Sequence, residues 1–120
     1  MPIYPDWRQT VRYSSDGPAA TVLHESAELK VVLVGLEPGQ QLPAHPAPAA
    51  SFHFLDGTGT MTVDDERLEV RRGSTVVVPS GARRGVTAGT RLAFLGTLGN
   101  PAADIEDAAD AAVTRITPGA

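Results

Sequence analysis

Three histidines and two adjacent arginines are the side chains of this sequence whose types and spacing best suit chemistry. His45 precedes His53 in the stretch HPAPAASFHFLDGTG, and no glutamate or cysteine lies between them. His24 lies upstream, and Arg83 and Arg84 lie downstream. An imidazole can ligate a metal or act as a general base near neutral pH, whereas a guanidinium suits a carboxylate or phosphate. The residues therefore present two alternatives, a metal site or a metal-free pocket for an organic anion.

The composition excludes several classes of protein. A chain of 120 residues suffices for one domain with a single core. Without cysteine, it has no disulfide, no thiolate nucleophile and no thiol-rich metal site. Its net charge of −4 gives no basic face for nucleic acid, and it lacks the apolar runs of a signal peptide or membrane helix. We therefore expect a cytoplasmic bacterial protein that binds neither nucleic acid nor membranes.

Short β-branched runs between clusters of Gly, Pro and Asp predict an all-β fold. Eight such runs with no helix between them indicate a sandwich or a barrel. The segment VDDERLEV predicts a tight hairpin turn around Asp64, Asp65 and Glu66. The expected strands cover residues 20–25, 29–37, 50–56, 59–64, 67–71, 74–78, 83–88 and 91–98.

The two ends of the chain lie outside this strand pattern. The N-terminal segment is rich in aromatic residues (Tyr4, Trp7 and Tyr13), so we expect it to be docked rather than loose. An apolar stripe near the C-terminus predicts a short helix that packs on the sheet or on a partner chain; it consists of Ile105, Ala109, Ala112 and Ile116. The expected divisions of the single domain 1–120 are an arm (1–18), a barrel (19–99) and a helical tail (100–120).

Glycine, histidine and proline residues are spaced in two groups within residues 38–89. Gly39, His45 and Gly57 form the first group, which closes in FHFLDGTGTMTV, and Gly73, Pro79 and Gly81 form the second in GSTVVVPSGARRG. In order and spacing these two groups resemble the two signature motifs of the cupin superfamily. This resemblance implies a small jelly-roll β-barrel, or double-stranded β-helix. It also implies a homodimer, with the N-terminal arm or the C-terminal helix at the interface.

The resemblance further implies a metal held by two histidines and a glutamate of the first motif and a histidine of the second. Only His45 is kept, because Ala47 replaces the second histidine and Arg84 replaces the last one. The glutamate position falls on Ala50, Ser51 or Phe52, depending on the counting frame. A divalent transition metal generally needs three or four protein donors. We therefore predict degenerate motifs with no metal and no other cofactor.

Alternation along the strand decides which side chains near His53 reach the interior. If Ala50 faces inward like the glutamate it replaces, Phe52 and Phe54 face inward and His53 faces outward. A bulge or a register shift would reverse these directions. In that alternative His45 and His53 both face the cavity. A rearranged metal site built from His24, His45 and His53 is a further alternative.

The predicted ligand site combines a cation, a base and an apolar wall. Arg84 is the expected anchor for an anion, and His45 is the expected catalytic base or hydrogen-bond partner. The expected lining residues are Phe52, Phe54, Met61 and His53. Three plainer alternatives stay open: both arginines extend into solvent at the rim, His45 keeps no chemical role, and the apolar residues are simple core.

The leading hypothesis is a metal-independent protein that binds a small anionic organic molecule in its barrel. Catalysis is left open; an enzymatic form would be an isomerase, cyclase or lyase that works by proton transfer. The alternatives are a metalloenzyme of the oxygenase or lyase type with rearranged histidines, and a non-catalytic sensor or storage protein. The fold alone does not decide among them.

Overall fold

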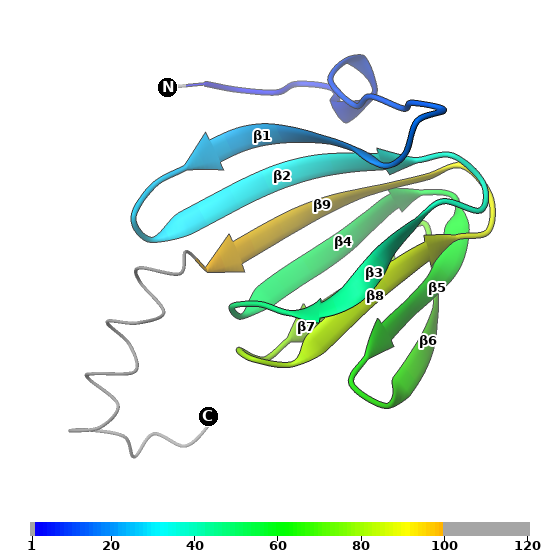
Figure 1. Cartoon of the computed structure of the whole chain (residues 1–120). Coiled ribbons are helices and arrows are strands. Elements are labelled where there is room, and N and C mark those ends of the chain that lie inside the picture. Colours follow the sequence, from blue (N-terminus) through cyan, green and yellow to red (C-terminus); the bar gives the residue numbers. More distant parts are fainter. Residues whose placement is uncertain (1, 100–120) are drawn as a thin grey trace.

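Two antiparallel sheets form the protein in the computed structural model, which describes residues 2–99. The five-stranded sheet has the order β1-β2-β9-β4-β7, and the four-stranded sheet has the order β3-β8-β5-β6. Figure 1 shows the sheets as two curved layers, and this arrangement confirms the all-β jelly-roll prediction. The strands are β1 (Ala19–Glu25), β2 (Leu29–Leu36), β3 (Gln41–Pro46), β4 (Ala50–Asp56), β5 (Thr58–Val63), β6 (Glu66–Arg71), β7 (Thr75–Val78), β8 (Arg83–Ala88) and β9 (Leu92–Gly99).

The hydrophobic core lies between the sheets and draws side chains from both. Val34, Phe54 and Phe94 come from the five-stranded sheet, and Met61 and Val86 come from the four-stranded sheet. The ring of Phe94 lies 5.5 Å from that of Phe52 and 5.4 Å from that of Phe54, measured between centroids. Alternation places one face of each strand in this core, and the opposite face is left for other contacts.

All eight predicted strands are present, and within residues 2–99 the sequence interpretation missed only β3. That segment contains Pro43 and Pro46, which lack the N–H group that a central strand would donate. Strand β3 tolerates them because it lies at an edge of its sheet and pairs only with β8. His45 therefore lies on a strand, where we expected a loop.

The tight turn between β5 and β6 forms at Asp64 and Asp65, as predicted. Asp64 has a φ of 52°, a left-handed conformation that aspartate tolerates better than most residues. Its carboxylate also accepts a hydrogen bond of 2.9 Å from the backbone N–H of Arg83. The turn thereby fixes the start of β8, the strand that carries both arginines.

The N-terminal arm (residues 2–18) docks on the outer side of the five-stranded sheet. A short 3₁₀ helix, η1 (Trp7–Gln9), is capped by the Asp6 carboxylate, which accepts from the backbone N–H of Arg8. The hydroxyl of Tyr4 donates to the carbonyl of Leu23 on β1 at 3.3 Å.

Two further expectations concern helices. The helical tail predicted for residues 100–120 lies outside the described residues. Within residues 2–99, no helix has the length and hydropathy that crossing a bilayer requires.

Candidate functional site

A small cavity lies between the two sheets, beside the pair formed by β3 and β8. Its volume is about 130 Å³. Two of its lining residues, His45 and Arg84, carry polar side-chain groups, and they face each other as direct partners in the β3–β8 ladder. The rest of the wall consists of Val32, Val34, Leu42, Ala47, Phe52, Gly85, Val86, Phe94 and Leu98.

Arg84 is buried, with only 3% of its surface exposed, so it does not extend into solvent at the rim. Its Nε donates to the carbonyl of Ala82 at 2.9 Å, and its Nη1 donates to that of Pro48 at 2.7 Å. Its Nη2 donates to the carbonyls of Ala47 and Pro79, at 2.9 and 3.3 Å. The guanidinium therefore ties the segment between β3 and β4 to the turn between β7 and β8.

Four of the five guanidinium N–H groups of Arg84 are thus occupied by carbonyl oxygens. The fork is not free for the two-pronged grip on a carboxylate that the sequence suggested. The remaining N–H belongs to Nη1. Among residues 2–99, no carboxylate lies within ion-pair distance of this group. Burial lowers the pKa of Arg84 because desolvation disfavours the charged guanidinium, and the carboxylate of Asp64 offsets part of this effect.

His45 is exposed and borders the cavity from strand β3. Its Nδ1 lies 3.0 Å from the carbonyl oxygen of Pro43, so Nδ1 carries the proton and donates it to that oxygen. The neutral ring then has its lone pair on Nε2. The hydrogen bond fixes the tautomer, leaving one nitrogen able to accept a proton or a hydrogen bond.

Three of the four other predicted lining residues lie away from the cavity. Phe54 and Met61 are fully buried in the core and do not border the cavity, in agreement with the plainer alternative of simple packing. His53 is exposed on the opposite face of β4, where its Nδ1 lies 2.7 Å from the hydroxyl of Thr75. Phe52 alone among the four lines the cavity. Even-numbered residues of β4 face inward, so Phe52 and Phe54 both reach the interior, but Phe54 lies in the filled core.

The three histidines of the rearranged metal set are not brought together. His24 is on β1 and His53 is on the outer face of β4, whereas His45 is on β3 of the other sheet. Within residues 2–99, no three His, Cys, Asp or Glu side chains converge in a way that could hold a metal ion.

A resident metal ion of the kind that the motifs imply does not fit the donors present here. Ala47 stands at one implied ligand position, and Ala50, Ser51 or Phe52 stands at the glutamate position; none of these side chains is a carboxylate or an imidazole, and Arg84 brings a positive charge to a further position. This charge opposes the binding of a cation, and His45 alone is too few donors for a divalent transition metal.

Besides Ala47 and Gly85, the sequence interpretation missed five aliphatic side chains of the wall, namely Val32, Val34, Leu42, Val86 and Leu98. Their strands were predicted, except for β3, and alternation does place Val32 and Val34 on one face. The sequence pattern does not show which strands pair with one another in the barrel. The ladder brings Val34 opposite Phe94, although sixty residues separate them.

Comparisons with known proteins agree with this architecture. The family model for the cupin domain matches residues 32–95, which is more than half of the chain. No curated protein has a significant match.

Solved structures show the same fold over most of the chain. A conserved protein of unknown function from Streptococcus pyogenes has a TM-score of 0.75 at 26% identity, covering 82% of this chain and 88% of that one. An RmlC-like cupin from Desulfovibrio desulfuricans has a TM-score of 0.74 at 27% identity, covering 82% and 96%. A protein from Thermus thermophilus shares the fold with a TM-score of 0.74 at 23% identity. The match covers 82% of this chain and 98% of that one. On its two sheets and the match over residues 32–95, the chain belongs to the cupin superfamily.

Proposed function

We propose that this cupin binds a small, largely apolar organic molecule with one negatively charged end. The observation that carries the proposal is a buried guanidinium, that of Arg84, beside an apolar cavity and without a carboxylate partner in the described residues. A buried charge is costly unless it is compensated, and a bound anion would supply the missing compensation.

The size of the cavity limits the ligand to about one ring. Engineered apolar cavities of about 150 Å³ hold benzene. The cavity here has a volume of about 130 Å³, so it suits a single ring or a short branched chain rather than a nucleotide or sugar. Its apolar wall favours the body of such a ligand, and the free N–H on Nη1 of Arg84 favours the charged end.

The proposed binding needs no metal ion. The ligand's charge would be met by Arg84, and a hydroxyl or N–H group of the ligand, where it has one, would donate to Nε2 of His45. Both groups belong to the chain itself, so removing metals should leave binding unchanged.

We expect benzoate, used as a probe of the right size, to raise the Tm in a concentration-dependent way, as linkage requires for a ligand of the folded state. Benzyl alcohol has nearly the same shape without the charge, so it should stabilise less. 2-Naphthoate should not stabilise, because its second ring exceeds the cavity. Differential scanning fluorimetry measures the Tm shift caused by each of the three probes. Repeating it after dialysis against EDTA shows whether the shifts depend on a metal ion.

Two variants on one strand locate the probe. Val32→Phe fills the cavity and should abolish the benzoate shift, whereas Val31→Phe places the same ring on the opposite face and should leave the shift intact. Equal shifts in both variants, or equal stabilisation by benzoate and benzyl alcohol, would refute the proposed site.

A second candidate function, proton transfer, rests on the fixed tautomer of His45. Nε2 has its lone pair available beside the cavity, and this is the arrangement of a general base. A base of this kind moves a proton from a carbon next to a carbonyl group, as isomerases, cyclases and lyases require.

The exchange of ligand protons for deuterium tests this second candidate. In D₂O the protein should speed the loss of α-proton NMR signals from small keto acids, and His45→Gln should abolish the effect while keeping the benzoate shift. If His45→Gln exchanges as fast as the parent, His45 is not the base. If neither protein speeds exchange, the function is binding alone.

A further inference from the structure

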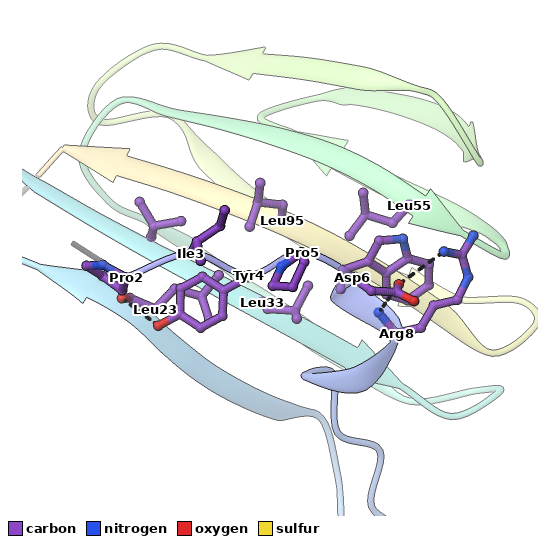
Figure 2. Close-up of a pocket in the computed structure, with 12 residues that line it drawn as sticks. Pro2, Ile3, Tyr4, Pro5, Asp6, Arg8, Leu23, Leu33, Leu55 and Leu95 are labelled. Atoms are coloured by element: carbon purple, nitrogen blue, oxygen red, sulfur yellow. Dashed lines mark hydrogen bonds and ion pairs between the residues drawn. The ribbon is translucent and has the colours of Figure 1, made fainter.

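The two faces of the edge strand β1 are covered unequally. Strand β1 pairs only with β2, at one end of the five-stranded sheet (Figure 1). Figure 2 shows the arm residues Tyr4 and Pro5 along the outer side of β1 and β2, where they line one groove with Leu23 and Leu33. Leu33 is only 1% exposed, so the arm covers this side of the sheet.

The inner side of β1 is open at Val22, which is 50% exposed. Val22 lies directly opposite Val32 of the cavity wall, so both side chains point to the same face of the sheet. An inward valine is buried where a strand of the other sheet lies across from it. Here five strands stand against four, and within residues 2–99 the smaller sheet does not cover Val22. An open apolar surface therefore adjoins the cavity wall at Val32.

A cation lies beside this surface. Lys30, the single lysine of the sequence, is directly opposite Leu98, another residue of the cavity wall. Its side chain therefore points to the inner face, and it is half-buried. Glu25 is its ladder partner on β1, but among residues 2–99 no carboxylate lies within ion-pair distance of Lys30.

The charges at the cavity favour a ligand with two anionic groups. Arg84 borders the cavity and Lys30 lies next to its wall, and neither has an ion-pair partner among the described residues. A single anionic group at Arg84 leaves Lys30 without a partner. A second anionic group on the same ligand would neutralise both cations, and its chain would cover the exposed Val22.

We infer that the ligand of the barrel cavity carries a second anionic group, which extends past Val22 and is held by Lys30. The inference rests on the proposed function and adds a second charged end to the same ligand. The apolar body fills the cavity beside Arg84, and a short flexible chain carries the second group out to Lys30. An ammonium on a flexible stem suits this role, because it needs no fixed two-pronged geometry. The ligand class is accordingly a small dicarboxylate with an apolar body, and Lys30 determines the specificity for it.

Isothermal titration calorimetry of the full chain with two matched probes tests this inference. One probe is benzoate with a para carboxyethyl chain, and the other is benzoate with a para propyl chain, which has nearly the same length without the second charge. The parent should bind the dianion about fivefold more tightly, the size expected of a partly exposed ion pair, and added salt should reduce this preference. Lys30→Met keeps an apolar stem without the charge, so it should bind both probes equally and keep the benzoate shift.

Three further substitutions separate a local contact from a general effect of charge. Arg72→Met removes one positive charge at an exposed position in the turn between β6 and β7, so it should leave the preference intact. Val22→Asp puts a carboxylate on the surface that the ligand chain crosses and should abolish the preference. Its matched control is Val77→Asp, which changes an exposed valine on β7, the other edge strand of the sheet, and should not.

Equal affinity of the parent for the two probes overturns the inference, and this is the result expected if residues 100–120 or a second chain cover the inner side of β1. A preference that survives Lys30→Met, or one that Arg72→Met abolishes equally, also overturns it. The proposed function is judged separately by benzoate. A parent that responds to benzoate without preferring the dianion keeps the proposed function and loses the second charged end, whereas a parent that responds to no probe refutes both.

Discussion

Replacing Arg84 by methionine is expected to lower the free energy of unfolding by about 3 to 5 kcal/mol. Methionine fills much of the same space, but it donates no hydrogen bond to the four carbonyl groups that Arg84 now satisfies. A buried acceptor left without a partner costs about 1 to 3 kcal/mol. Some of these carbonyls lie near the surface and will regain water, so the total stays below the sum of four such losses. Urea denaturation followed by circular dichroism measures the change.

Arg83→Met is the matched control, because the neighbouring arginine is exposed and makes one side-chain contact, to the carbonyl of Ala44 at 3.0 Å. We expect it to cost less than about 1 kcal/mol. Arg84→Lys should fall between the two, since an ammonium keeps the charge but cannot span the same carbonyls. Equal costs at both positions would show that the guanidinium of Arg84 does not hold these segments together.

Phe94→Ala is expected to cost about 3 to 5 kcal/mol, the range typical of a buried phenylalanine replaced by alanine. The ring is 1% exposed and packs between Phe52 and Phe54, so its removal ends both aromatic contacts. It also borders the barrel cavity, and its loss should therefore enlarge that cavity. Thermal and urea denaturation of the variant measure the loss of stability.

The enlarged cavity adds a second readout to Phe94→Ala. 2-Naphthoate, too large for the parent, should now raise the Tm of the variant. Leu95→Ala removes a large side chain on the other face of the same strand, where it is only partly buried. This control should lose less stability and gain no response to 2-naphthoate. If Phe94→Ala loses stability but 2-naphthoate does not raise its Tm, the ring of Phe94 does not limit the size of the ligand cavity.

The strands were predictable because their signals are local. Alternation placed Phe52 and Phe54 inward and His53 outward on β4, as the structure has them. Strand β3 was not predictable in the same way. Its prolines, Pro43 and Pro46, oppose strand formation unless the segment lies at an edge of the sheet. Whether a segment lies at an edge depends on pairing between distant residues, which the sequence pattern does not contain.

The chemistry of the site was predictable only in part. The motif spacing brought His45 and Arg84 into one site, and both border the cavity. It did not predict that backbone carbonyls would occupy most of the Arg84 guanidinium, because those carbonyls belong to two turns far apart in the chain. Met61 was misplaced for a related reason: an inward direction does not distinguish a cavity wall from a filled core.

The prolines of strand β3 also affect how the protein behaves at high concentration. An open sheet edge is a template on which further chains can add as strands and grow into fibrils. Pro43 and Pro46 interrupt the row of donors that such growth needs. The strand that carries His45 beside the cavity thereby also protects the molecule from polymerising through that edge.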